Sequence, residues 1–532
     1  MHVCKSKAGC MLNGLPVHRR RRYNGHLPPT PAWTSESAPG VSILRPLSGL
    51  DCNLADNLES SFRQVYPTFE LLLSVTDEAD AAIPIVRELM AKYPDVDARL
   101  IIGAHLNTLS DWMWALKSAC DAAGAEEVGV NPKVNNLIRS YRAAKYDILW
   151  VLDSNVLTTT TTLARSVALL TSRGGAPEGE KSLLSRGGGR VGLVHHVPFA
   201  IFADDLLGAR VEQAFLGTTH AKMYLAINKV AVDSCVMGKS CLFRRTDIES
   251  AAQQARLKVP ALKASQAGAP TTSSSDASEG GELNGLATFG QYLGEDNMIG
   301  RAIWHDLGLR HAMGSDVAGN AVGHMDLNTY FRRRVRWIRV RKYMVLYVLS
   351  SAHLAYPDAR TPLMSCYSAS TLLEPLTENV VVGLLLVYAL IKLLELGGDS
   401  TRAHALWGAL IFCAHLLLVY SIDARVYEAL NASSPAQHSR SHLPHHSTAW
   451  TFTFARAWLV RELLALPVWL FAMLGNTVVW RAGADTFLVN MDGTVRSLAS
   501  GEQEGLAERV FQRVVHGRRP QTQQYERLPG AA

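Results

Sequence analysis

A run of twenty residues without Asp, Glu, Lys or Arg, from Ala403 to Ile422, most constrains how this chain folds. Twenty apolar residues in a helix span about 30 Å, which is the thickness of the hydrocarbon core of a bilayer. Two more apolar stretches flank this run. One is Leu463 to Trp480, which contains a proline that membrane helices tolerate, and the other is Asn379 to Ile391, with apolar character continuing to Leu396.

The alternative for these stretches is a set of buried helices in a soluble domain. Length and lack of charge favour a membrane region over residues 372–480, with about three helices at 374–396, 403–422 and 457–480. The sequence therefore predicts an integral membrane protein whose apolar anchor lies toward its C-terminal end.

Charge and cysteine content exclude several other classes. The chain has 53 Lys+Arg and 47 Asp+Glu, so its net charge is 53 − 47 = +6. Spread over 532 residues, this net charge is too small to indicate a nucleic-acid partner. Its eight cysteines are scattered and form no CxxC pair, so neither a disulfide framework nor a structural zinc site is expected. We expect a domain that faces the reducing cytosol.

Residues 39–330 alternate between strand and helix patterns. Short apolar strands are predicted at Val41–Leu44, Phe69–Val75, Ala98–Ile102 and Ile148–Leu152, the last of which is apolar on both faces. Helical spacing falls between them, at 54–64 and 83–93. This alternation predicts an α/β domain with an open sheet, in which ligands bind at the carboxyl ends of the strands.

Three stretches of this domain look inserted. Leu106–Glu127 has mixed composition, whereas Ser172–Arg190 and Val259–Gly281 are rich in Gly and Ser and resemble flexible loops. Because longer loops cost little to close, folding should survive deletion of Leu106–Glu127, and we expect the deleted form to be at least as active as the full chain. Outside the domain, residues 1–38 are expected to form a disordered tail with a four-arginine run, and residues 481–532 a C-terminal tail.

Carboxylates follow two of the predicted strands. Asp77 and Asp80 come after Phe69–Val75, and Asp153 comes directly after Ile148–Leu152. Hard divalent cations prefer oxygen ligands, so these positions suit a nucleotide with a metal ion. Taken singly, each acid is more often a turn or helix-cap residue than a ligand. A third acidic position, the pair Glu295-Asp296, precedes an apolar helix and has helix capping as its simple alternative.

A basic segment lies just before the membrane region. Phe331–Lys342 reads FRRRVRWIRVRK, with seven cations in twelve residues and Trp337 among them. Within a predicted segment of residues 331–356, this pattern is typical of an amphipathic helix at a membrane surface. Its arginines would also suit a diphosphate leaving group.

The three acids followed by Arg333-x-x-Arg336-Trp337 resemble the D, D, D, (Q/R)xxRW signature of inverting, membrane-bound glycosyltransferases similar to family 2. The closer resemblance is to the ceramide glucosyltransferases of family 21, and it runs from residue 39 to about 481. The stretches that carry it are Pro39–Gly49, Tyr93–Arg99, Val128–Leu137, Ala144–Ser154, Val191–His195, Met237–Arg244, Gly294–Asp296 and Leu373–Pro375.

This resemblance implies a GT-A-like open mixed sheet with a nucleotide-binding half, and it implies roles for particular residues. Asp80, or its neighbour Asp77, and Asp153 would bind the uridine and a divalent cation, Mn or Mg, with Asp153 as the metal ligand. Asp296 would be the general base. The remaining implied roles are nucleotide contacts for Lys133 and Asn136, diphosphate and acceptor contacts for Arg333, Arg336 and Trp337, and acceptor-side positions for His195 and Cys241.

The implied reaction moves glucose from UDP-glucose to the primary hydroxyl of ceramide with inversion, giving β-glucosylceramide and UDP. The expected setting is a Golgi or endoplasmic reticulum membrane, with the catalytic domain facing the cytosol. The alternatives are a processive polysaccharide synthase, which shares the signature, and a catalytically inactive homologue. Three departures from the family are the expected but missing transmembrane helix before residue 39, the insertion at 106–127, and an excess over about Leu346–Leu372.

Overall fold

The structure is a computed structural model that describes residues 29–103, 127–172, 189–230, 234–258, 284–342, 379–396, 400–435, 448–480, 485–490 and 493–497. The chain divides into two compact units. The first combines Met1–Tyr330 with Asn379–Glu462, and the second combines Phe331–Glu378 with Leu463–Ala532. The interiors of the three predicted insertions lie outside the described residues, as do residues 1–28 and 498–532 of the two predicted tails. Within those tails, Trp33 donates a hydrogen bond to the Ala164 carbonyl at 3.1 Å, and residues 485–497 include two short strands.

An eight-stranded mixed sheet forms the centre of the first unit, in the order β3-β2-β1-β4-β7-β6-β8-β5. Strands β1, β2, β3 and β4 are mutually parallel, whereas β7 runs antiparallel to both β4 and β6. The sheet confirms the expected α/β class with an open mixed sheet. The strands are β1 (Val41–Pro46), β2 (Phe69–Val75), β3 (Ala98–Ile102), β4 (Ile148–Leu152), β5 (Val156–Leu157), β6 (Val191–Ala203), β7 (Ser240–Arg244) and β8 (Arg310–Gly323).

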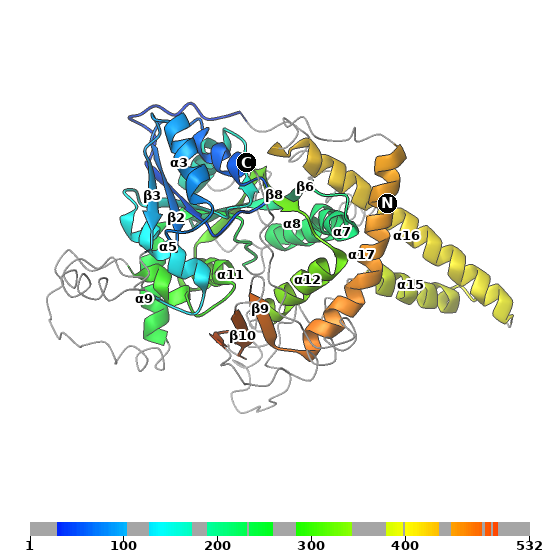
Figure 1. The fold of residues 1–532 in the computed structure, drawn as a ribbon. Helices are drawn as coiled ribbons and strands as arrows, with labels where there is room; N and C mark the ends of the chain where they lie inside the picture. The colour runs from blue at the N-terminus through cyan, green and yellow to red at the C-terminus, as the bar shows by residue number, and fades with distance from the viewer. Residues whose placement is uncertain are drawn as a thin grey trace, which may run out of the picture. The chain divides into compact units, whose positions relative to one another are not determined.

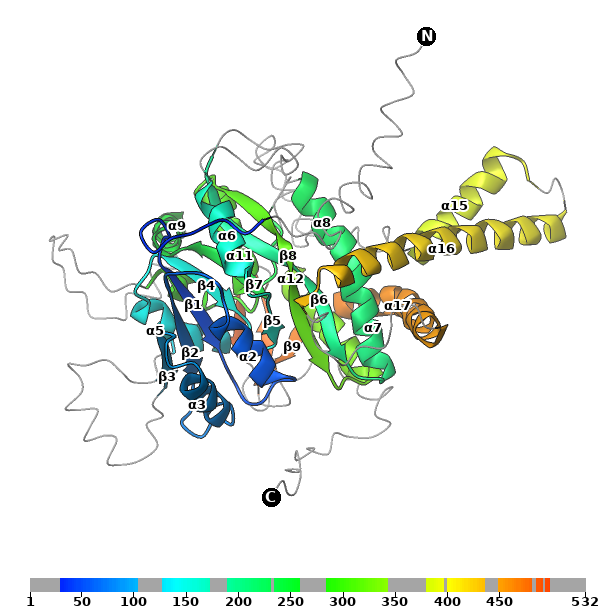
Figure 2. The same cartoon turned by 90° about the horizontal axis from the view of Figure 1, so that it is seen from above.

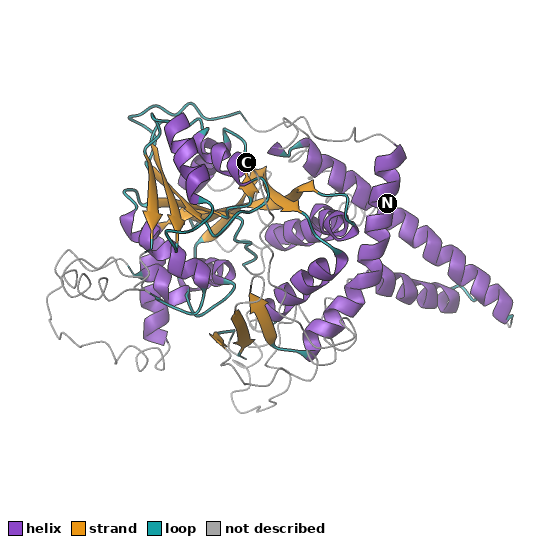
Figure 3. Ribbon diagram, in the orientation of Figure 1, coloured by secondary structure: helices purple, strands orange, loops and turns teal. Residues whose placement is uncertain are grey.

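Helices cover both faces of this sheet because its central strands are apolar on both sides. On β4, Ile148, Trp150 and Leu152 pack in one core, while Leu149 packs in the other. The first core contains α2 (Leu54–Phe62), α3 (Ile83–Lys92) and α6 (Thr162–Thr171). The second contains α5 (Pro132–Ala143), α9 (Arg245–Lys258), η2 (Gly285–Phe289), α11 (Glu295–Arg301) and η3 (Ala302–Asp306). Figure 3 separates these helices from the strands.

Each strand and helix that the sequence predicts between residues 41 and 152 is present, with ends shifted by at most two residues. Further along the chain, α7 (Leu207–Phe215), η1 (Leu216–His220) and α8 (Ala221–Val230) form one nearly continuous helical stretch after β6. The sequence analysis did not predict this stretch.

Two helices among the described residues are long and apolar enough to cross a membrane. They are α16 (Thr401–Ala432) and α17 (Thr448–Leu474), and the apolar window of α17 begins at Phe452. A shorter apolar helix, α15 (Asn379–Leu393), lies alongside α16 in Figures 1 and 2, where Gly383 allows close approach to Phe412 and His415.

The last predicted apolar run does not form a helix throughout. Helix α17 ends at Leu474, and Thr477–Trp480 forms strand β9. Gly475 and Asn476 interrupt the helix, and the sequence Thr-Val-Val-Trp that follows is rich in residues that favour strands.

A buried ionic cluster anchors α16 inside the first unit. Asp423 is fully buried, and its two carboxylate oxygens lie 2.5 Å from the Lys222 ammonium and 3.2 Å from the Arg461 guanidinium. The Trp458 indole N–H donates to the same carboxylate at 2.8 Å. Because Lys222 lies on α8 and Arg461 on α17, the cluster joins three helices of the unit.

The second unit receives the chain through α12 (Leu327–Arg341), most of which belongs to it. There, Val335 and Ile338 of α12 pack with Val468 and Ala472 of α17. A small antiparallel sheet in the order β11-β10-β9 completes the described part of the unit, with β10 at Asp485–Val489 and β11 at Val495–Ser497.

Candidate active site

Asp153 lies where β4 ends beside β7. The register pairs Leu152 with Ser240, so Asp153 sits opposite Lys239, whose carbonyl accepts from the Asp153 N–H at 3.3 Å. The guanidinium of Arg45, buried on β1, donates to the Asp153 carbonyl at 3.1 Å and to the Val156 carbonyl at 3.0 Å. The backbone after β4 is therefore held from both neighbouring strands.

Two lysines hold the Asp153 carboxylate. Its Oδ1 lies 2.8 Å from the ammonium of Lys133, and its Oδ2 lies 2.7 Å from that of Lys239. Burial alone raises the pKa of Asp153, but the charges of the two lysines outweigh this effect and bring the pKa below its ordinary value. This carboxylate is therefore ionised at physiological pH.

Lys133 also contacts a second acidic position. Its ammonium lies 2.8 Å from Glu295 Oε1, and the other oxygen of Glu295 accepts from the Asn131 amide at 2.8 Å. Asn131 caps α5 through its side chain, and Lys133 is the second residue of that helix. Burial lowers the pKa of Lys133, but Asp153, Glu295 and Asp296 together raise it well above its ordinary value, so the ammonium keeps its charge.

Asp296, the predicted general base, follows Glu295 at the start of α11. The Gly238 N–H donates to its carboxylate, and a Cβ at Gly238 would lie 2.9 Å from the Asp296 side chain, so only glycine fits this approach. Desolvation and the negative charge of Glu295 raise the pKa of Asp296 to about 6, against the lowering effect of Lys133. At pH 7 the carboxylate is mostly ionised and can accept a proton.

The segment from Met237 to Lys239 connects these groups to the acceptor-side residues. His195 and Cys241 are register partners on β6 and β7. The His195 Nδ1 shares a 2.5 Å hydrogen bond with the Tyr224 hydroxyl, which accepts from the Met237 N–H at 3.1 Å. Burial, followed by the charge of Asp296, raises the pKa of the Cys241 thiol, so it remains protonated.

Asp77, Asp80 and Asn136 make backbone contacts around the ends of β1 and β2. Asp80 accepts from the Gly49 N–H at 2.9 Å, and Asp77 accepts from the Ala79 N–H at 2.9 Å in a turn. The Asn136 amide donates to the Leu47 carbonyl at 2.8 Å and to the Ser74 carbonyl at 3.1 Å. These contacts shape the two loops, while the nucleotide roles of the three residues stay predictions.

Arg333, Arg336 and Trp337 lie on α12 in the second unit. The guanidinium of Arg333 stands 4.8 Å from the centre of the Trp337 ring, within the range of a cation–π contact. Their predicted contacts with diphosphate and acceptor stay predictions.

Asp153 and Asn155 offer oxygen atoms of the kind that a hard divalent cation prefers, while both oxygens of the Asp153 carboxylate are paired with the ammonium groups of Lys133 and Lys239. Lys239 donates to Asn155 Oδ1 at 3.0 Å as well as pairing with Asp153, so a positive charge already lies beside these two oxygens. Mg²⁺ sites commonly use one or two carboxylates together with phosphate oxygens of the substrate, and this pair of oxygens matches that pattern. Among the described residues, no group of three His, Cys, Asp or Glu side chains is placed to hold a metal.

Lys239 and Arg45 were not predicted as site residues from the sequence, and Glu295 was noted only as the acid beside Asp296. Each lies in a stretch that carries the family resemblance, which was the one available signal. Their placement beside Lys133 and Asp153 depends on strand register and on the packing of α5 and α11.

The amino-acid sequence matches a known protein family over most of its length. The model of glycosyl transferase family 21 matches residues 9–111, 117–252 and 280–407. The chain belongs to this family. It is 33% identical to a ceramide glucosyltransferase of Komagataella phaffii, covering 86% of this chain and 84% of that one, and 31% identical to one of Candida albicans, covering 88% and 90%.

Among solved structures, the chain is similar to a mannosyltransferase from Pyrobaculum calidifontis in complex with GDP-Man and Mn2+. The TM-score is 0.31 and the identity 16%, over 86% of this chain and 96% of that one.

Membership of family 21 makes the chain a glycosyltransferase, and the apolar helices α16 and α17 indicate membrane association. The site built around Asp153, Lys133 and Asp296 lies at the carboxyl end of β4, where an open α/β sheet binds its ligands.

Proposed function

We propose that this chain transfers glucose from UDP-glucose to the primary hydroxyl of ceramide, with inversion, to give β-glucosylceramide and UDP. The observation that carries the proposal is the convergence of Asp153, Lys133 and Asp296, in a chain 33% identical to a ceramide glucosyltransferase. The names of these relatives favour a lipid acceptor over the growing polysaccharide of a processive synthase.

Asp296 acts as the general base in this proposal. Its carboxylate takes the proton from the ceramide hydroxyl as the oxygen attacks the anomeric carbon of glucose, within hydrogen-bond reach of about 3 Å. The pKa of about 6 keeps Asp296 ionised at pH 7, and its bond from Gly238 fixes its position. The neighbouring Glu295 is unsuited to this role because it is paired with Lys133 and Asn131.

Lys133 and Lys239 supply positive charge where the nucleotide diphosphate leaves. Asp153 fixes the positions of both ammonium groups, and its single negative charge offsets only one of their two positive charges. Asp153 and Asn155 would hold a divalent cation, Mn or Mg, which when bound neutralises charge on the departing diphosphate. Arg333 and Arg336 would add further cations to the same leaving group.

The proposed setting is a Golgi or endoplasmic reticulum membrane, with the catalytic domain on the cytosolic side. The apolar helices and the dispersed cysteines support this placement.

The test combines detergent-solubilised protein, labelled UDP-glucose and ceramide, followed by chromatography of the lipids. We expect labelled glucosylceramide from the parent chain. Asp296→Asn should reduce kcat by about 10²–10⁴-fold while UDP-glucose still binds, because a base acts on the acceptor. Glu59→Gln, at a partly exposed position of α2 that pairs with Lys92 outside the site, is the control. A parent chain that glucosylates no ceramide would refute the proposal.

A further inference from the structure

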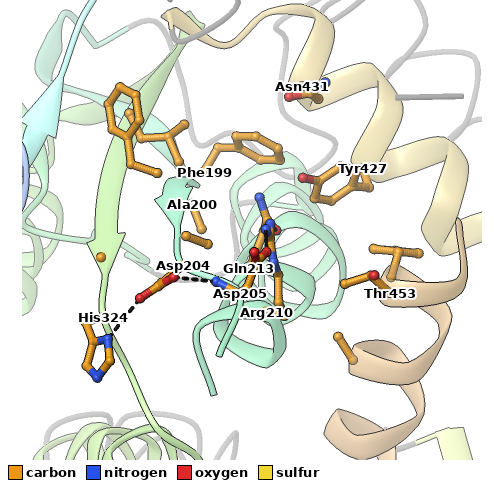
Figure 4. A pocket seen from close by; sticks show the side chains of 16 residues that line it. Phe199, Ala200, Asp204, Asp205, Arg210, Gln213, His324, Tyr427, Asn431 and Thr453 are labelled. Carbon is orange, nitrogen blue, oxygen red and sulfur yellow. Dashed lines mark hydrogen bonds and ion pairs between the residues drawn. The ribbon is translucent and has the colours of Figure 1, made fainter. Parts of the chain in front are cut away.

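A cavity of about 570 Å³ in the first unit lies outside the site described above. Its walls come from the ends of β6 and β8, from α7, and from the apolar helices α16 and α17, as Figure 4 shows. The volume falls within the range of about 300–1,000 Å³ that is common for small-molecule sites.

Aromatic side chains form the inner wall. Phe199, Tyr427 and Phe454 are almost completely buried, and the ring of Tyr427 lies 5.1 Å from each of the other two rings, measured between centroids. Phe199 comes from β6, Tyr427 from α16 and Phe454 from α17. This wall offers apolar surface to an aliphatic chain.

The rim of the cavity carries charges that are already paired. Asp204 lies 2.9 Å from His324, and Asp205 lies 2.6 Å from Arg210. The Asp205 side chain is 90% exposed, so this pair lies at the opening. A rim of this kind provides hydrogen-bond donors and acceptors for a neutral polar group, since each of its carboxylates is already paired with a basic side chain.

The cavity lies close to the proposed sugar-transfer site. Asn155, which shares Lys239 with Asp153, exchanges hydrogen bonds with Ala321 on β8. Gly323, two residues further along that strand, lines the cavity, and two residues of strand span about 7 Å. The rim is thus linked to Asp153 through Ala321, Asn155 and Lys239.

The cavity also lies at one end of the apolar helices. Tyr427 follows the uncharged run of α16 by five residues, which is about 7.5 Å of helix. Thr453 of α17, which also lines the cavity, lies within the second turn of its helix. A membrane that covers the uncharged run would therefore end near the cavity.

We propose that this cavity binds the headgroup of the lipid acceptor, an inference that rests on the proposed function. The ligand class is a neutral amphipathic lipid with hydroxyl and amide groups. The polar groups meet the paired charges of the rim and point toward Asp153, and the start of an acyl chain lies against Phe199, Tyr427 and Phe454.

The test uses Thr453→Trp, which fills the cavity from α17. We expect the KM for ceramide in mixed micelles to rise about tenfold or more, while the KM for UDP-glucose stays within about twofold, because only acceptor binding is lost. A photoactivatable ceramide should label the cavity segments 199–213 or 427–457 in the parent chain and lose that labelling in the variant. Leu459→Trp, on an exposed face of the same helix, is the control.

A second variant, Ala203→Phe, narrows the cavity from β6. UDP binding shows whether each variant is folded, and if Thr453→Trp does not bind UDP, the result of Ala203→Phe decides the test. If the parent glucosylates ceramide but both folded variants keep the ceramide KM and the labelling, the cavity is not the acceptor site. Absence of any glucosylceramide from the parent would instead overturn the proposed function.

Discussion

Two carboxylates near Lys133 have opposite electrostatic surroundings. Asp153 contacts two ammonium groups, and its pKa lies below the ordinary value in spite of its burial. Asp296 lies beside the acid Glu295, and desolvation together with that charge raises its pKa to about 6. Carboxylates separated in this way can take different roles, one as a fixed anion for cations and the other as a proton acceptor.

The pKa of Asp296 predicts the pH dependence of transfer. The base must be ionised, so kcat/KM should be constant above about pH 7 and fall below about pH 6, approaching tenfold per pH unit, as Asp296 is protonated. Glu295→Gln removes the neighbouring negative charge and should move this acid limb to lower pH. The measurement is kcat/KM for ceramide between pH 4.5 and 8. Glu59→Gln serves as the control, and a limb that moves to higher pH in Glu295→Gln would contradict the assignment.

Asp153 has a different expected phenotype. Asp153→Ala leaves Lys133 and Lys239 facing each other without their shared anion, and it removes the carboxylate proposed to hold the metal. We expect Mg²⁺ or Mn²⁺ to lose its effect on UDP affinity in this variant, as measured by calorimetry with and without chelator. UDP affinity that still responds to the metal would place the cation elsewhere.

At the scale of elements, the link between the apolar helices and the rest of the first unit depends on one buried anion. Asp423 of α16 faces Lys222 of α8 and Arg461 of α17. Arg461 also contacts Glu462 and the Thr218 hydroxyl, and Asn379 of α15 donates to Glu462 at 2.9 Å. Polar contacts thus join five helical elements, α8, α15, α16, α17 and η1, in addition to their apolar packing.

Removal of this anion should destabilise the unit strongly. Asp423→Ala removes the shared partner of the buried Arg461 and the partly exposed Lys222, and although Arg461 keeps its contact with Glu462, loss of one member of a buried pair typically costs about 3–5 kcal/mol. Thermal unfolding in detergent should show a clearly lower Tm. Ser421→Ala, at an exposed position of the same helix, should change the free energy of unfolding by less than about 0.5 kcal/mol. Equal Tm values for the two variants would show that the cluster contributes little.

At the scale of the whole molecule, the proposed orientation can be tested at a natural glycosylation sequon. Asn431-Ala432-Ser433 lies at the end of α16, and Asn431 lines the cavity formed with β6 and α7 of the catalytic domain. If that domain faces the cytosol, this asparagine is never exposed to the glycosylation machinery of the lumen.

We therefore expect no glycan on Asn431. The chain expressed in a eukaryotic host should migrate identically before and after endoglycosidase treatment, and Asn431→Gln should leave its mobility unchanged. A mobility shift that the enzyme removes and that Asn431→Gln abolishes would place the domain in the lumen.

The sequence by itself determined the order of strands and helices over residues 41–152, the acids that follow them, and the apolar helices. These features depend on residue periodicity, local turn chemistry and the length of uncharged runs, which are all properties of neighbouring residues. The signature of spaced acids followed by Arg333-x-x-Arg336-Trp337, and with it the family resemblance, could be identified for the same reason. Each part of the signature is a short local pattern.

Only the tertiary structure decided which side chains meet. Lys133 and Glu295 lie on α5 and α11, Asp153 directly follows β4, and Lys239 directly precedes β7. Their ion pairs depend on the β4–β7 register and on how two helices pack on one sheet face. The pKa of Asp296 follows from that packing, because it depends on desolvation and on charges distant in sequence. The cavity beside β6 also depends on tertiary structure, since its walls come from segments more than 200 residues apart in sequence.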